Sequence, residues 1–188
     1  MENIPALLQD LKNYLIHTFE EVYKWFDTDA QLLTFVPENG GWTVAQILEH
    51  IALTNHFLLI LIEKGCRKAL NKHQNEPELL ASLLPAYTFR KDALTEIGLY
   101  NSFTWIRPEH MEPKGETLDV KALLGVQLQK CLDMLALLPN GEGILYQTTM
   151  TVHNLGKIDV YEYIYFLGQH AQRHIGQMQK NLACFYHT

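Results

Sequence analysis

Two histidines in the C-terminal part of the chain are spaced so that both side chains can bind one ion. His170 and His174 are four residues apart, and in a helix this separation puts both on one face, with Cβ atoms about 5–6 Å apart. At about 100° of turn per residue, Phe166 and Leu167 share the same stripe. We therefore predict that the histidine pair faces the interior of the protein.

A third histidine lies on the inward face of another predicted helix. His50 follows Ile47 by three positions and precedes Thr54 by four, so it falls within the apolar stripe of that helix. Buried neutral imidazoles need partners for their ring nitrogens, and clustered cationic imidazoles repel one another. A divalent ion that accepts one nitrogen from each ring meets both requirements. We therefore take His50, His170 and His174 as candidate metal ligands.

Three histidine ligands leave coordination positions open. Three protein ligands plus water are typical of a catalytic zinc site, whereas structural zinc is almost always closed by four protein ligands, and imidazole also suits nickel, copper and iron. Asp159 and Glu162 lie about two turns or more from His170, so we do not expect them to close the shell. An ion held in this way acidifies a bound water or thiol near neutral pH.

The same histidines also have an interpretation without metal. A lone HxxxH spacing is common in helices, and buried imidazoles can instead hydrogen-bond to hydroxyls and amides. Gln177 and Tyr163 share the stripe of His170 and are the expected partners of the imidazoles. Glu49, next to His50, could accept a hydrogen bond beside the site or act as a general base. Its angular position instead favours the solvated surface of its helix, where we expect it.

The hydrophobic pattern predicts four long helices that position these side chains. Apolar residues recur at three- and four-residue spacing in each of them. The predicted helices cover residues 5–26, 43–65, 118–138 and 159–181. Thr43 with Gln46, and Asp159 with Glu162, have the spacing of N-terminal cap pairs, which supports the start of the second and the fourth helix.

A long crossover separates the second and third predicted helices. Prolines punctuate residues 71–116, which leaves room for short helices near residues 78–84 and 89–97. Residues 144–152 favour a short extended piece or a hairpin. Four amphipathic helices with one long crossover predict an all-α four-helix bundle in which the second and third helices run parallel. Residues 1–188 would then form a single domain.

Composition narrows the possible partners. The 188 residues include 15 Lys and Arg against 21 Asp and Glu, which gives a formal net charge of -6. This balance argues against a nucleic-acid partner, because phosphate binding draws on clustered basic residues. The longest apolar run covers residues 57–62, whereas a membrane-spanning helix needs about 20 residues. We therefore expect neither a nucleic-acid partner nor a membrane span.

The cysteines favour a reducing compartment. Cys66, Cys131 and Cys184 are odd in number and far apart, which fits neither a disulfide framework nor a CxxC-type site. None has a context that lowers the pKa of its thiol, so none is a candidate nucleophile. The chain also opens with an acidic residue where a secretory signal carries positive charge. A cytoplasmic location is expected.

Several aromatic residues are candidates for the mouth of a pocket. They are Trp42, Tyr100, Phe103, Trp105 and Tyr146. Aromatic side chains more often belong to the hydrophobic core, which is the alternative for each of them.

Two blocks of the sequence resemble the DinB-like superfamily. Residues 41–51 fit its W-[ST]-x-x-Q-[IVL]-L-x-H block, and residues 170–177 fit its H-x-x-R-H-x-x-Q block. Residues 107–114 also resemble its crossover, and the similarity spans the whole chain. The resemblance implies a four-helix bundle of up-down-down-up order. It further implies a divalent metal, commonly nickel or zinc, held at the positions of His50, His170 and His174.

The resemblance leaves two classes of function open. Characterised members include low-molecular-weight-thiol transferases and mycothiol-dependent isomerases, in which the metal activates a cofactor thiol. The first class is therefore a metal-dependent thiol S-transferase or hydrolase for a small-molecule substrate, with bacillithiol, mycothiol, glutathione or no thiol. The second is a non-catalytic metal-binding or stress-response scaffold, possible as a homodimer. An exchangeable ligand position beside a pocket large enough for a thiol favours the enzyme.

Overall fold

Four long helices make up most of the protein. The structure is a computed structural model and describes residues 2–38, 40–102, 108–115 and 119–187. The long helices are α1 (Ile4–Lys24), α3 (Val44–Asn75), α6 (Val120–Leu137) and α7 (Val160–His187). The shorter helices are α2 (Ala30–Thr34), α4 (Pro77–Leu83) and α5 (Lys91–Thr95), and the strands are β1 (Gln147–Met150) and β2 (Gly156–Asp159). The predicted all-α fold is confirmed.

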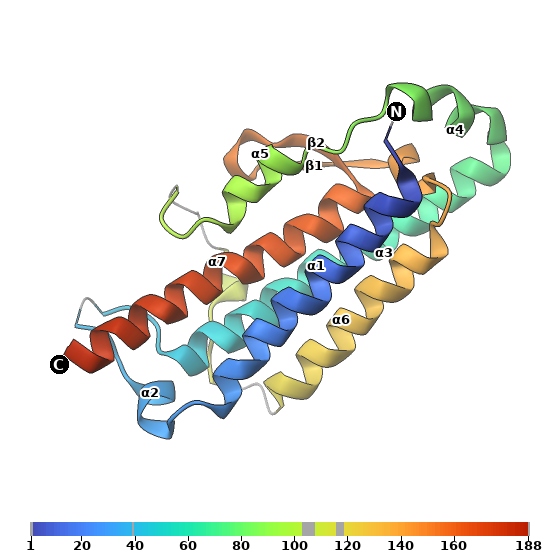
Figure 1. Ribbon diagram of the computed structural model, residues 1–188. Helices are drawn as coiled ribbons and strands as arrows, with labels where there is room; N and C mark the ends of the chain where they lie inside the picture. The colour runs from blue at the N-terminus through green and yellow to red at the C-terminus, as the bar shows by residue number, and fades with distance from the viewer. Residues whose placement is uncertain (1, 39, 103–107, 116–118, 188) are drawn as a thin grey trace.

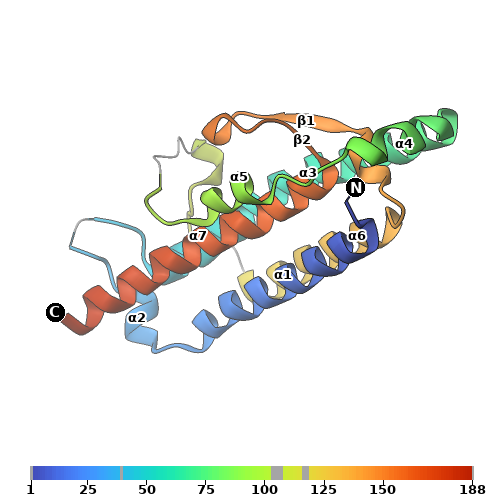
Figure 2. The same cartoon turned by 45° about the horizontal axis from the view of Figure 1, so that its top comes forward.

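The long helices lie side by side along a common direction. Both α1 and α3 pack against α6 and against α7. In Figure 1 the chain runs the same way along α3 and α6, and the opposite way along α1 and α7. The crossover carries α4 and α5 between α3 and α6, and Figure 2 shows α5 and the β1–β2 hairpin over α7. Residues 160–171 of α7 are buried on every side as a result.

Helix α3 begins where the sequence predicts and ends later. The Gln46 amide N–H donates to Thr43 Oγ1 at 3.2 Å, and the Thr43 N–H donates to Gln46 Oε1 at 3.0 Å, which confirms the predicted cap. The predicted end at Gly65 is wrong, because the helix continues to Asn75. A Cβ at position 65 would lie 3.1 Å from Val160 Cγ2, so the glycine allows α3 to approach the start of α7 closely.

Helix α7 also starts as predicted and runs past its predicted end. The Glu162 N–H donates to Asp159 Oδ1 at 3.0 Å, and the Asp159 N–H donates to Glu162 Oε2 at 3.1 Å. The helix then continues to His187, six residues beyond the predicted end at residue 181. The predicted start of the third helix at residue 118 lies outside the described residues, and α6 is described from Val120.

The hairpin confirms the extended piece that the sequence favours. Strand β1 pairs with β2 in antiparallel register, from Gln147 opposite Asp159 to Met150 opposite Gly156. The two short helices that the sequence predicts in the crossover are also present, as α4 and α5. The hairpin therefore joins the end of the bundle to the first turn of α7.

One helix has the length and composition of a membrane span. Among the described residues this is α3, but 61% of its most apolar 18-residue window is buried inside the protein. A mostly buried apolar helix is typical of the core of a soluble protein. The fold is therefore consistent with a soluble protein.

Candidate metal centre

Three imidazoles from two helices converge in the interior. One ring nitrogen of each of His50, His170 and His174 lies within 4.8 Å of the others, and the side chains are 3%, 2% and 8% exposed. The ring centroids are 5.2 Å apart for His50 and His170, and 4.7 Å apart for His50 and His174. The three residues that the sequence placed on inward faces are thus brought together where α3 packs against α7.

Hydrogen bonds fix the orientation of two of the rings. His50 Nδ1 lies 2.7 Å from the Met111 carbonyl oxygen, and His174 Nδ1 lies 2.9 Å from Gln177 Oε1. Both oxygens only accept hydrogen bonds, so each Nδ1 carries the proton and the lone pair is on Nε2. This is the arrangement in which a histidine presents Nε2 to a metal while its other nitrogen is held by a neighbouring oxygen. Gln177 is confirmed as a partner.

The nitrogen donors fit a divalent ion. His170 Nε2 and His174 Nε2 are 3.1 Å apart. Two nitrogens bound to one tetrahedral zinc at about 2.0–2.1 Å are themselves about 3.3 Å apart, so the observed spacing is close to that of a shared ion. A hydrogen bond between one protonated and one unprotonated nitrogen has a similar length, which is the metal-free interpretation.

The electrostatic environment keeps the imidazole of His170 neutral. Burial, followed by the neighbouring His174 and His50, holds the pKa of His170 well below its ordinary value. Metal binding requires neutral imidazole, because protons and metal compete for the same nitrogen. His170 is therefore in the protonation state that a metal requires at neutral pH.

Glu49 is not where the sequence predicted it. Its carboxylate is buried and accepts hydrogen bonds from the backbone N–H groups of Lys114 at 3.3 Å and Gly115 at 2.9 Å. The expected solvated position is wrong because the crossover folds back over α3 and covers that face. Glu49 thereby holds the crossover segment that also supplies the Met111 carbonyl to His50.

The histidine cluster opens into a cavity of about 590 Å³. The predicted aromatic residues Trp42 and Tyr100 line this cavity, and the Trp42 ring centroid lies 4.6 Å from that of His50. Tyr146 instead borders a separate groove on α3. Phe103 and Trp105 lie outside the described residues. Tyr163 lines the same cavity as the histidines.

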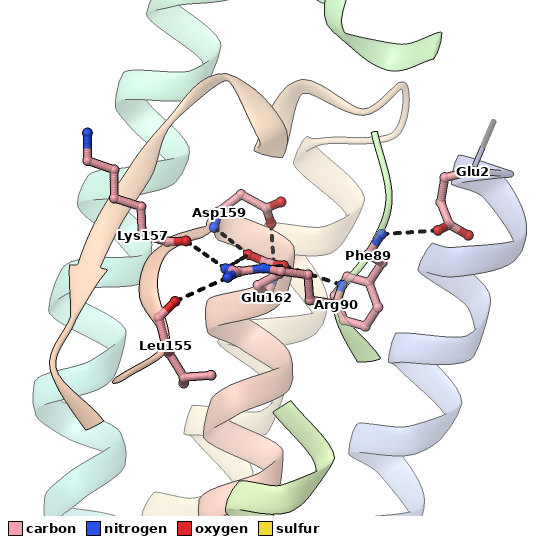
Figure 3. Close-up of polar contacts among 7 residues, drawn as sticks. All are labelled: Glu2, Phe89, Arg90, Leu155, Lys157, Asp159 and Glu162. Carbon is pink, nitrogen blue, oxygen red and sulfur yellow. Dashed lines mark hydrogen bonds and ion pairs between the residues drawn. The ribbon is translucent and has the colours of Figure 1, made fainter. Parts of the chain in front are cut away.

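Among the described residues that line the cavity there is no Asp, Glu or Cys beside the three histidines. Asp159 and Glu162 accept hydrogen bonds from each other's backbone N–H at the start of α7, and Glu162 also binds Arg90, as Figure 3 shows. Cys66 and Cys131 are buried, and burial raises the pKa of each thiol to about 12, so neither is a reactive thiolate. The described cavity lining therefore supplies no fourth His, Asp, Glu or Cys ligand.

Sequence reasoning missed two groups that shape the site. The Met111 carbonyl belongs to the crossover, 61 positions from His50, and no local pattern points to a backbone partner at that distance. Arg173 donates through Nη1 to the Leu99 carbonyl and, at 3.2 Å, to Ser102 Oγ. Its place between the two histidines of α7, inside the H-x-x-R-H block, is a signal that points to it.

The comparisons with known proteins agree with this geometry. The family model described as the DinB superfamily matches residues 8–178, which include all three histidines. No significant match is found among curated proteins, nor among solved structures. The match covers most of the 188 residues, and the helical fold and three-histidine cluster fit it. The chain therefore belongs to the DinB superfamily.

Proposed function

We propose that this protein is a metal-dependent enzyme in which His50, His170 and His174 hold a divalent ion, zinc or nickel. The observation that carries the proposal is the convergence of three buried imidazoles at the inner end of a cavity of about 590 Å³. A divalent ion held there would acidify a water or a low-molecular-weight thiol and so supply a nucleophile near neutral pH. The reaction class is transfer of a thiol to a small-molecule substrate, or hydrolysis of such a substrate.

The chain's own residues orient the donor nitrogens and exclude water. The Met111 carbonyl and Gln177 Oε1 hold the Nδ1 protons of His50 and His174, which directs the lone pairs of both to Nε2. Trp42 packs beside the His50 ring and covers it from one side. Such fixed ligands lower the free energy needed to organise a site, because they are already in place before the substrate arrives.

An open coordination position distinguishes an enzyme from a scaffold. Structural zinc is almost always closed by four protein ligands, and the described lining of the cavity offers three. This count supports catalysis over a purely structural ion. We propose a small-molecule substrate, with no nucleic-acid partner, and a reducing cytoplasm as the location, which the free thiols of Cys66 and Cys131 support.

Metal analysis of untagged protein tests the site. We expect about one divalent ion per chain, lost in His174→Ala. His56→Ala is the matched control, because His56 is an exposed histidine on α3 that does not line the cavity. The proposal would be contradicted if the wild-type protein is metal-free and its melting temperature does not change with added zinc or nickel. The three histidines would then be hydrogen-bonded core residues.

A thiol titration then tests the chemistry. In cobalt-substituted protein, a small thiol such as 2-mercaptoethanol should bind the open position and shift the charge-transfer bands. The His174→Ala variant should show no such shift. Bands that thiol, azide and cyanide all leave unchanged would show a closed shell. The protein would then be a non-catalytic metal-binding scaffold, such as a stress-response module that acts as a homodimer.

A further inference from the structure

The cavity beside the three histidines is lined by both polar and apolar side chains. The imidazoles and Gln177 are among the polar ones, with Thr54, Asn101 and Thr151. Helix α3 contributes Phe57, Leu58 and Leu61, which lie within four residues of one another. A ligand that reaches the imidazoles therefore shares the cavity with hydrocarbon and aromatic surface.

Two methionines from other elements add adaptable apolar surface to the lining. Met111 reaches the cavity from the crossover, and Met150 reaches it from the end of β1. Methionine side chains are flexible and polarizable, and they adjust to ligands of irregular shape. A volume of about 590 Å³ is within the range of pockets that enclose a drug-sized molecule.

Fixed charge is scarce in this lining. Arg173 is the one Lys, Arg, Asp or Glu among the described residues that border the cavity. Its guanidinium donates to the Leu99 carbonyl and to Ser102 Oγ, so it fastens the neighbouring cavity wall at Tyr100 to α7. Tyr100 in turn packs on Gly176, where an added Cβ would lie 3.0 Å from the Tyr100 Cβ. The cation of the lining is thus engaged in building the wall.

We infer that the substrate of this cavity carries an uncharged, mostly apolar chain, such as a medium-length alkyl or aryl group, behind a polar head that reaches the imidazoles. The inference rests on the proposed function, since it assigns the substrate class of the same site. A charge on the chain, away from the head, would lose its hydration against Phe57, Leu58 and Leu61, which costs several kcal/mol. An apolar ligand gains free energy from the same walls.

Three hydroxamates, which share one metal-binding head, test the inference by calorimetry on zinc-loaded protein. They are acetohydroxamate, octanohydroxamate, and the monohydroxamate of suberic acid, which matches the octanoyl chain in length but ends in a carboxylate. Each buried methylene should raise affinity about fourfold, so octanohydroxamate should bind at least about 100-fold more tightly than acetohydroxamate. The suberic compound should lose most of this gain in affinity over acetohydroxamate, because its carboxylate lies at the far end of the chain. Equal affinities for the two long compounds, or no gain over acetohydroxamate, would overturn the inference.

A metal-free measurement separates this inference from the metal centre. In chelator-treated wild-type protein, 1-octanol should displace an uncharged fluorescent dye, and suberate should not. If 1-octanol displaces the dye while octanohydroxamate binds zinc-treated protein no better than 1-octanol does, the metal proposal fails and the substrate class stands. If the hydroxamates bind but the octyl chain adds nothing, the substrate class fails and the metal centre stands.

Two neighbouring substitutions locate the apolar chain in the cavity. Leu61 and Ile60 are adjacent on α3 and are 39% and 50% exposed, but only Leu61 lines the cavity among the described residues. Leu61→Glu should weaken octanohydroxamate about tenfold or more and leave acetohydroxamate unchanged, because it puts a charge against the alkyl chain. Ile60→Glu should change neither. Unchanged octanohydroxamate binding in Leu61→Glu would contradict the assignment.

Discussion

Two polar clusters lie along α7, and they differ in how their hydrogen-bonding groups are paired. At the start of the helix, the Glu162 carboxylate accepts hydrogen bonds from Arg90 Nε at 2.7 Å and Nη2 at 2.8 Å, and from the Asp159 N–H at 3.1 Å (Figure 3). Arg90 also donates to the carbonyls of Leu155 and Lys157. This cluster of Arg90, Asp159 and Glu162, the Arg90 cluster, is closed by opposite charge and by backbone groups.

The histidine cluster of His50, His170 and His174 has no opposite charge of this kind among the described lining residues. Its three rings are alike, and their proximity helps to hold the pKa of His170 below its ordinary value. Neighbouring neutral imidazoles can share one metal cation. Protonation of more than one of them is disfavoured, because the positive charges would repel each other. The comparison teaches that the closed cluster joins parts of the fold, and that the histidine cluster suits an ion from outside the chain.

The Arg90 cluster joins segments that are distant in sequence. Arg90 belongs to the crossover, its carbonyl partners belong to the hairpin, and Glu162 belongs to α7. The adjacent Phe89 N–H donates to Glu2 Oε2 at 3.1 Å, which adds the segment just before α1 to the same junction (Figure 3). At 1.5 Å rise per residue, Glu162 and His170 are about 12 Å apart along α7, so substitutions in the two clusters should act independently.

Metal-dependent stability is the largest effect expected from this comparison. Zinc at 1,000 times its Kd should raise the free energy of unfolding by about 4 kcal/mol, because it binds only the folded chain. His170→Ala should abolish the increment, and Arg90→Ala should retain it. Thermal unfolding with and without zinc measures both. An increment that survives in His170→Ala would place the ion at another site.

Breaking the Arg90 cluster should lower the free energy of unfolding by less than the loss of bound zinc does. Arg90→Ala leaves the Glu162 carboxylate buried without its cation. Because the Arg90 side chain is itself 41% exposed, the free energy of unfolding should fall by about 2 kcal/mol, less than for a fully buried pair. Glu162→Gln combined with Arg90→Ala should regain part of the loss, because no uncompensated charge remains. Urea unfolding measures both variants. A loss below about 1 kcal/mol in Arg90→Ala would mean that the ion pair behaves as an exposed one.

Opposite pH dependences of the metal-free protein are the smallest effect. Burial and then the charge of Glu162 raise the pKa of Asp159 from 3.8 to about 7, so its contribution to stability is present at low pH and is lost as pH rises toward 7. The lowered pKa of His170 has the reverse sign, since the unfolded chain takes up the proton first as pH falls below about 6.5.

Single substitutions separate these two slopes. Between pH 7 and pH 5, Asp159→Asn should lose more stability on acidification than the wild type, and His170→Gln should lose less. Each difference is at most about 1.4 kcal/mol per pH unit for one proton. Chemical unfolding at several pH values, with chelator present, measures the slopes. Two variants that change the slope in the same direction would contradict the assigned signs.

Features carried by local pattern were predictable from the sequence. The caps at Thr43 and Asp159 depend on a spacing of three residues, and the inward faces of His50, His170 and His174 depend on helical periodicity. Periodicity also gives the relative phase of residues on one helix. The sequence therefore predicted which histidines meet, although not which backbone groups orient them.

Features that depend on contacts between distant segments were not predictable. The sequence gives no sign that Glu49 is buried, because the N–H groups that it binds lie 65 and 66 positions away in the crossover. Gly65 has the character of a helix end, but its function is set by Val160 on another helix. Arg90 likewise has no local partner, and its bonds exist only once the crossover and hairpin have packed on α7.

X-ray absorption spectroscopy of zinc-loaded, untagged protein tests the central claim most directly, because it counts and identifies the atoms around the metal. The histidine cluster predicts three imidazole nitrogens at about 2.0–2.1 Å and one further light atom, which a small thiol replaces with sulfur at about 2.3 Å. This spectrum should be absent in His174→Ala and unchanged in His56→Ala. Fewer than three imidazoles in the wild type, or four protein ligands that thiol does not alter, would contradict the account.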